Sequence, residues 1–306
     1  MIQSPLNYTG GKYKLLPQIL PLFPQNIDTF VDLFCGGCNV GINIKSNRVI
    51  YNDLNQNLLC LYNTFRNLGP DLVLDWVYEI IEKYGLSIVS KYGYEHYNCD
   101  SSKGLGDYNK EKFITLRNDF NKKHAEENYD YYYYVMLYVI IVYAFNNQIR
   151  FNAHGEFNLP VGKRDFNSKM EQKLVEFIDQ LRKQNCTFTC CDFREFDTSA
   201  LTSQDFVYVD PPYLITCATY NEQGGWDEIA EKDLLAFLDD LHDRSIRFAL
   251  SNVLRSKGKE NSILISWLAQ NSNKYRAVPL NYSYSNSSYH TKDKTSSSEE
   301  VLIVNY

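Results

Sequence analysis

An apolar run that ends in a glycine turn constrains the fold of this chain more than any other feature. Residues 30–37 read Phe-Val-Asp-Leu-Phe-Cys-Gly-Gly, and a helical pattern follows near Val40. A second apolar run ends at Asp53, seventeen residues after Gly36. Glycines let a backbone approach a ligand closely, and an acidic residue after the second strand can bind the two hydroxyls of a ribose. The pattern predicts a βαβ unit that binds an adenosine-containing cofactor.

Two cofactors suit this pattern, a nicotinamide dinucleotide and S-adenosylmethionine. The turn lacks the G-x-G-x-x-G spacing, which weakens the dinucleotide interpretation. A second glycine element, residues 7–12, opens the first predicted helix with Asn-Tyr-Thr-Gly-Gly-Lys. There the helix N-terminus and Lys12 can hold a carboxylate such as the methionine end of S-adenosylmethionine, while Tyr8 can pack against the cofactor or the core. The alternative is a loop that caps a surface helix.

The tetrapeptide Asp210-Pro211-Pro212-Tyr213 follows a strand-like run at 206–209 and points to chemistry on an amino group. The exocyclic amine of a nucleobase is a weak nucleophile because its lone pair is delocalised into the ring. The Asp210 carboxylate and a backbone carbonyl fixed by the prolines can accept hydrogen bonds from that amine, and Tyr213 offers a ring for stacking. The tetrapeptide predicts an amino-methyltransferase. The alternative is a rigid turn without chemistry.

Periodicity indicates two sheet-forming parts separated by helices. The expected strands are 29–34, 48–52, 187–191, 206–209, 247–251, 275–278 and 301–305. The expected helices are 11–22, one from residue 55, 71–84, 109–125, 131–145, 228–241 and 261–270. The polar segment 281–300 is expected to be a loop. Together these elements predict an α/β fold with an inserted helical lobe.

Composition narrows the class of protein. The 306 residues are 44% hydrophobic with a net charge of −6, enough for one core and a lobe, and this charge does not exclude a local basic face. Eight cysteines without a signal peptide predict reduced thiols in the cytoplasm. Cys35 and Cys38 have the spacing of half a metal site, yet no second pair follows, so we expect no metal. The apolar run 131–145 is too short for a membrane span, which needs about 20 residues.

Four elements stand in one order along the chain: 5–12, 30–37, 51–55 and 210–213. This order resembles the Dam family of DNA adenine-N6 methyltransferases over nearly the whole chain, and most closely its bacteriophage members. The resemblance implies a Rossmann-like, S-adenosylmethionine-dependent methyltransferase sheet with an inserted, mainly helical target-recognition domain that carries a β-hairpin. The implied limits are a catalytic domain in two parts, 1–56 and 169–306, and a target-recognition domain at 57–168. The one departure from the family pattern is the presence of cysteines within the glycine turn. It puts little in doubt, because the backbone of this turn, rather than its side chains, contacts the cofactor.

The motifs and the resemblance together predict the site residues, and the family's binding positions carry over to Tyr8, Lys12, Asp53 and Asp210. The catalytic set is Asp210, Pro211, Pro212 and Tyr213. The cofactor set is Tyr8, Gly11, Lys12, Asp32, Phe34, Gly36, Asp53, Asp192 and Asp210. Asp192 follows a predicted strand and is placed to reach the cofactor adenine, although an exposed strand-end aspartate explains it equally well.

Residues 146–164 resemble the recognition hairpin of the family, with a turn at 153–155. Arg150 can make a bidentate bond to guanine, worth about 1–3 kcal/mol of discrimination. Lys163 can contact phosphate, and Arg164 can contact either guanine or phosphate. Phe145 can wedge between bases or belong to the core. The predicted DNA-binding set is Phe145, Asn147, Arg150, Asn152, Pro160, Lys163 and Arg164.

Relatives that carry N-x-I-R-x-N before G-x-F read GATC, and this chain has that pattern at 147–152. The expectation is therefore methylation of N6 of an adenine flipped out of GATC in double-stranded DNA, in a bacterial or phage-infected cell, with no obligate protein partner. Two alternatives stay open: a non-catalytic DNA-binding regulator on this scaffold, and a methyltransferase acting on RNA or on a protein amide. The latter relatives typically carry Asn where this chain has Asp210, and they lack the hairpin.

Overall fold

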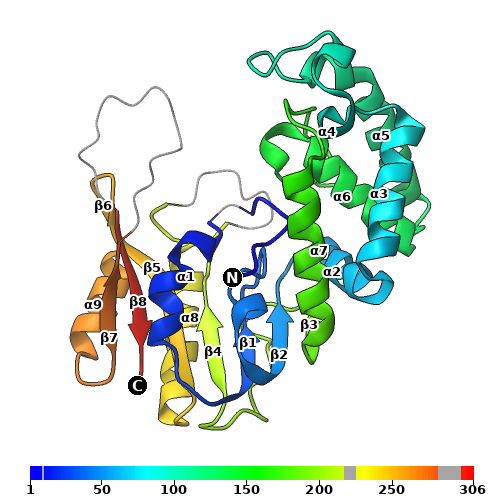
Figure 1. Cartoon of the computed structure of the whole chain (residues 1–306). Coiled ribbons are helices and arrows are strands. Elements are labelled where there is room, and N and C mark those ends of the chain that lie inside the picture. The colour runs from blue at the N-terminus through cyan, green and yellow to red at the C-terminus, as the bar shows by residue number, and fades with distance from the viewer. Residues whose placement is uncertain (9, 217–224, 282–297) are drawn as a thin grey trace. The chain divides into compact units, whose positions relative to one another are not determined.

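The computed structural model describes residues 1–8, 10–216, 225–281 and 298–306. Its chain forms two compact units, each of three segments (Figure 1). Unit 1 comprises 1–11, 36–43 and 55–184, and unit 2 comprises 12–35, 44–54 and 185–306. Most of the predicted loop 281–300 lies outside the described residues, as does Cys217. The functional division at residues 56 and 168 stays a prediction, since the two units are defined by packing alone.

Unit 2 is built on one mainly parallel sheet. Its strands are β1 (Ile27–Asp32), β2 (Ser46–Asn52), β3 (Cys186–Thr189), β4 (Phe206–Val209), β5 (Arg247–Ser256), β6 (Lys259–Glu260), β7 (Arg276–Leu280) and β8 (Glu299–Val304). They are ordered β3-β2-β1-β4-β5-β8-β7, with β6 paired to β5. The strands from β3 to β5 are parallel, and β8 runs antiparallel to both β5 and β7. The sheet confirms the predicted α/β fold class with a Rossmann-like sheet.

Helices cover both faces of this sheet. Helices α8 (Glu228–Asp243) and α9 (Ser262–Gln270) pack Leu234 and Leu264 into a core with Val207 and Leu250 (Figure 1). Alternate strand residues point to the other face. There Phe206 lies 4.8 Å, between ring centroids, from Phe23, which follows the first helical segment.

The first helical segment is not the continuous helix predicted at 11–22. It consists of η1 (Lys12–Leu15), α1 (Leu16–Ile19) and η2 (Leu20–Leu22). Pro17 and Pro21 stand in the first turns of α1 and η2. A proline donates no N–H and clashes with the preceding turn, so it can begin a helix but not continue one.

Unit 1 is helical and is organised around one buried helix. Its elements are η3 (Gly41–Asn43), α2 (Gln56–Leu68), α3 (Pro70–Tyr84), α4 (Val89–Tyr92), η4 (Glu95–Tyr97), α5 (Gly106–Ala125), α6 (Tyr131–Tyr143), η5 (Phe145–Asn147) and α7 (Ser168–Lys183). Helix α6 packs against α2, α3 and α5, and all of its residues from Val135 to Tyr143 are buried. A helix enclosed on all sides reads as uniformly apolar. No helix among the described residues is both long and apolar enough to cross a membrane.

Helix α7 was not predicted, although its sequence carries the usual signals. The Asn167 side chain caps its first turn by accepting from the N–H groups of Lys169 and Met170. Its buried side chains, Leu174, Phe177, Ile178 and Leu181, recur at helical spacing.

Candidate active site

Three predicted aspartates lie along the edge of the sheet in unit 2 that is formed by the carboxyl ends of its parallel strands. Asp32 ends β1, Asp53 follows β2 and Asp210 follows β4. These strands are parallel neighbours, with β1 between β2 and β4. Ligands of open parallel sheets bind outside the carboxyl ends of the strands, where the chain order reverses direction, and here that point lies between β1 and β4. The structure therefore brings these three carboxylates to the edge expected of a binding site.

Asn52 fixes the backbone at this edge. The residue is 2% exposed, and its side-chain amide donates to the carbonyl oxygens of Leu33 at 3.1 Å and Cys191 at 3.0 Å. Its backbone carbonyl accepts from the N–H of Cys35 at 2.8 Å. The segments that leave β1, β2 and β3 are thus tied together. Asn52 was not predicted as a functional residue, because its partners lie far along the chain.

Asp210 belongs to a cluster of four polar side chains. The Lys12 ammonium lies 2.9 Å from Asp210 Oδ1, and the Tyr213 hydroxyl donates to the same oxygen at 2.9 Å. The Lys12 Nζ also lies 3.8 Å from Glu300 Oε1 and 4.9 Å from the centre of the Tyr213 ring. A further contact joins the Tyr213 hydroxyl to Glu300 Oε1 at 3.5 Å. Three predicted residues are thus brought together, and Glu300 is added to them.

Burial, and next the negative charges of Asp210 and Glu300, raise the pKa of the Tyr213 hydroxyl well above its ordinary value. The hydroxyl therefore keeps its proton and remains a donor. Pro211 is buried, and the N–H of Thr216 donates to the Tyr213 carbonyl at 3.1 Å, closing the turn. The tetrapeptide is held as a defined turn at the end of β4.

Aromatic rings gather near the end of β1. Phe34 lies 5.7 Å from Phe193 and 5.8 Å from Trp226, between ring centroids. The Trp226 indole donates to the fully buried Glu231 at 2.6 Å, and Glu231 also accepts from Asn261 at 2.7 Å. This network holds Trp226 beside Phe34.

Asp192, the predicted adenine contact, is engaged with Arg194. Both of its carboxylate oxygens accept from Nη1 of Arg194 at 3.1 Å, and the Nε of Arg194 donates to Asp233 Oδ2 at 2.8 Å. The role of Asp192 in cofactor binding stays a prediction.

In unit 1, Tyr8 packs on the glycine turn. Gly36 has φ of 44°, and a Cβ built on it would lie 2.8 Å from Cε1 of Tyr8. The N–H of Gly11 donates to the Tyr8 carbonyl at 3.1 Å, and the Tyr62 hydroxyl donates to the Gly36 carbonyl at 3.0 Å. Only glycine fits both the φ and the space at position 36.

The cysteines of this turn, Cys35 and Cys38, are buried, and the cysteines of the described residues form no disulfide. The same residues contain no group of three or more His, Cys, Asp or Glu side chains able to hold a metal ion.

The predicted hairpin is present in irregular form. Single bridges pair Phe151 with Phe157 and Ala144 with Val161. Its turn is built by Asn152, whose side-chain oxygen accepts from the N–H groups of His154 at 2.9 Å and Glu156 at 3.0 Å. Asn152 therefore has a structural role in addition to the predicted contact with DNA.

Helix α5 holds the hairpin by contacts to its backbone. The Asn121 amide donates to the Phe157 carbonyl at 3.1 Å and accepts from its N–H at 2.9 Å, and Arg117 donates to the Leu159 carbonyl at 3.0 Å. Within the hairpin, the Arg150 Nε donates to Asn158 Oδ1 at 2.7 Å. The guanidinium of Arg150 is thus oriented before any ligand binds.

The remaining predicted DNA contacts differ in exposure. Phe145 is 48% exposed, and Pro160, Lys163 and Arg164 are also exposed. Asn147 is buried, where its amide donates to the carbonyls of Ile141 and Val142 at the end of α6 and its oxygen accepts from Asn7. Asn147 therefore caps a helix, a role that its position in the motif did not indicate.

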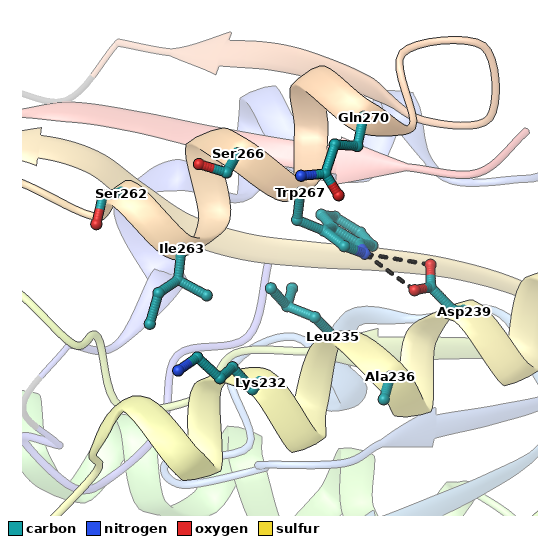
Figure 2. Close-up of a pocket in the computed structure, with 9 residues that line it drawn as sticks. All are labelled: Lys232, Leu235, Ala236, Asp239, Ser262, Ile263, Ser266, Trp267 and Gln270. Carbon is teal, nitrogen blue, oxygen red and sulfur yellow. Dashed lines mark hydrogen bonds between the residues drawn. The ribbon is translucent and has the colours of Figure 1, made fainter.

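A cavity of about 470 Å³ lies between α8 and α9 (Figure 2). Figure 2 shows Lys232, Ser262 and Ser266 among its lining residues, and the Trp267 indole bonded to Asp239. None of the predicted site residues lines this cavity.

A family model for D12 class N6 adenine-specific DNA methyltransferases matches residues 8–297. The Type II methyltransferase M.FokI of Planomicrobium okeanokoites is 42% identical over the entire chain, which spans 43% of that relative. The DNA adenine methylase of Escherichia coli K12 is 28% identical over 71% of the chain and 66% of its own length. The DNA N-6-adenine-methyltransferase of Escherichia phage P1 is 25% identical over 82% of the chain and 30% of its own length.

The chain belongs to the D12 class of N6 adenine-specific DNA methyltransferases. The resemblance drawn from the four ordered motifs is thereby confirmed. The chain spans less than half of the length of M.FokI.

Proposed function

We propose that this chain transfers a methyl group from S-adenosylmethionine to N6 of an adenine in double-stranded DNA. The observation that carries the proposal is the cluster at the end of β4, in which Lys12 and Tyr213 both contact Oδ1 of Asp210. The second carboxylate oxygen, Oδ2, is then the acceptor for an N–H of the target amine. This hydrogen bond draws the lone pair back onto nitrogen and stabilises the positive charge that develops there.

S-adenosylmethionine supplies an electrophilic methyl group on a sulfonium. Its adenosine suits the carboxylates at the sheet edge, where Asp53 would bind the ribose hydroxyls. Tyr8, Gly11, Lys12, Asp32, Phe34, Gly36 and Asp192 complete the proposed cofactor set. The target adenine leaves the stack at a cost of a few kcal/mol, and Tyr213 offers it a ring.

Gly36→Ala is expected to weaken cofactor binding by about tenfold, because the new Cβ displaces the Tyr8 ring and strains the turn. Gly93→Ala is the matched control: Gly93 also has positive φ, 76°, but a Cβ there meets nothing within 4 Å. Both variants should lose stability, and only Gly36→Ala should lose affinity in a cofactor titration. Equal affinities would contradict a role for this turn in cofactor binding.

The hairpin supports reading of a short site, and GATC is the sequence to test first. Arg150 is oriented by Asn158 for a bidentate guanine contact, while the exposed Phe145 can fill the space of a flipped base. Lys163 and Arg164 are exposed to meet phosphates. A Type II methyltransferase is among the relatives, so the proposal includes a different adenine-containing site as an alternative to GATC. It also includes a role in restriction–modification in the cytoplasm.

Two other functions are disfavoured by the site. A non-catalytic regulator would have no need of Lys12, Tyr213 and Asp210 in a mutually bonded cluster. A methyltransferase for RNA or for a protein amide would have no need of a hairpin with oriented arginine. Methylation of RNA or protein, with none of DNA, would favour the latter.

The test is incubation of the protein with labelled S-adenosylmethionine and duplexes that contain GATC, followed by mapping of modified bases in DNA from cells that express it. We expect N6-methyladenine within one short sequence. If the mapped site is not GATC, the site assignment is wrong and the reaction stands. Absence of N6-methyladenine at saturating cofactor and DNA would refute the reaction itself.

A further inference from the structure

Glu300 is a buried carboxylate that no motif includes. It lies in β8, and its side chain is 1% exposed. Its neighbour Glu299 faces the other way, with its side chain 46% exposed and 2.9 Å from Nη1 of Arg255. Successive residues of a strand point to opposite faces, so this pair places one carboxylate in solvent and one in the cluster around Asp210.

The cluster around Asp210 has an uneven charge. Lys12 contributes one positive charge, and Asp210 and Glu300 contribute two negative charges. A buried carboxylate is costly unless it is paired and hydrogen-bonded, and Glu300 meets both Lys12 and Tyr213. Without Glu300, the ammonium of Lys12 would neutralise Asp210, the group that must stabilise the positive charge that develops on the target amine during transfer.

We propose that Glu300 is a positioning residue for methyl transfer, which holds Lys12 and the Tyr213 hydroxyl on Oδ1 of Asp210 and keeps the cluster negatively charged. The inference rests on the proposed function. Glu300 acts through Lys12 and Tyr213, which both contact Asp210.

The chemistry of the step explains why the net charge matters. The N6 lone pair forms a bond to the methyl carbon, the carbon–sulfur bond breaks, and its electron pair stays on sulfur. Positive charge thus passes from sulfur to nitrogen, and the product amine then loses a proton to water. A negative cluster beside the nitrogen favours the transition state over the ground state, which raises kcat rather than affinity.

The test is Glu300→Gln, which preserves the shape of the side chain and removes its charge. We expect kcat for DNA methylation to fall about tenfold or more, with the Kd for S-adenosylmethionine within about twofold of the wild-type value. The matched control is Glu299→Gln on the same strand, for which the wild-type kcat is expected. Glu300→Asp retains the charge on a shorter side chain and should recover part of the lost rate.

A double-mutant cycle separates this role from packing. If Glu300 acts through Lys12, the loss in kcat caused by Glu300→Gln should be smaller in a Lys12→Gln background than in the wild type. A folded Glu300→Gln variant with wild-type kcat, or equal losses in both backgrounds, would overturn the inference. If Glu300→Gln does not fold, Glu300→Asp tests the inference instead. A wild-type rate in Glu300→Asp would show that the exact position of the carboxylate does not matter, which would also overturn the inference. An inactive wild-type protein would instead refute the proposed function.

Discussion

Asp210→Ala is expected to lower kcat for adenine methylation by about a thousandfold or more, because the variant has no acceptor for the amine and no group to stabilise the charge on N6. The substitution also leaves the Lys12 ammonium, 4% exposed, with Glu300 as its remaining carboxylate among the contacts described above. The kcat of Asp210→Asn should lie between those of the wild type and Asp210→Ala, since its amide oxygen accepts a hydrogen bond but carries no negative charge. The measurement is single-turnover transfer of labelled methyl groups to duplex DNA.

The control for Asp210→Ala is Asp240→Asn in the same unit. Asp240 is 59% exposed and paired with Arg244 on α8, so its loss should leave the rate unchanged. Thermal unfolding and a cofactor titration on each variant separate a loss of chemistry from a loss of fold or of binding. If folded Asp210→Ala retained more than about a tenth of the wild-type rate, the assigned mechanism would be wrong.

Where the proposed site residues directly follow a strand in the sequence, both the strand and these residues could be predicted. Strand β4 has the predicted limits, because four apolar residues are followed at once by Asp210 and two prolines that cannot extend it. The edge aspartates Asp32 and Asp53 follow from the same logic, since parallel strands end at one edge of the sheet. Local order was sufficient for these features.

Features that depend on distant pairing were missed. Glu300 was placed in a loop, because nothing local tells which of two adjacent glutamates faces the core. Its direction is set by the pairing of β8 with β5 and β7. The bonds from the Asn147 amide to carbonyls at the end of α6 were also not predicted, and its contact with DNA stays a prediction. The broken first helix is different: Pro17 and Pro21 signalled it, and the prediction of 11–22 gave them too little weight.

Arg150→Ala is expected to reduce discrimination between the cognate site and a site with one substituted guanine by up to about a hundredfold, which corresponds to the 1–3 kcal/mol of a bidentate contact. The variant should still methylate adenine in DNA, because the cluster around Asp210 is unchanged. The measurement is kcat/KM on the cognate duplex and on single-base variants. Unchanged ratios would show that another residue reads the base.

Lys163→Ala is the control that distinguishes loss of a base contact from loss of a phosphate contact. Lys163 is exposed, and a contact from its ammonium to phosphate carries no sequence information. Its loss should weaken binding to cognate and non-cognate duplexes by the same factor and lower the dependence of log K on log salt by about one. If Arg150→Ala instead weakened all duplexes equally and lowered the salt dependence, Arg150 would contact the backbone, and the discrimination would have to come from elsewhere on the hairpin.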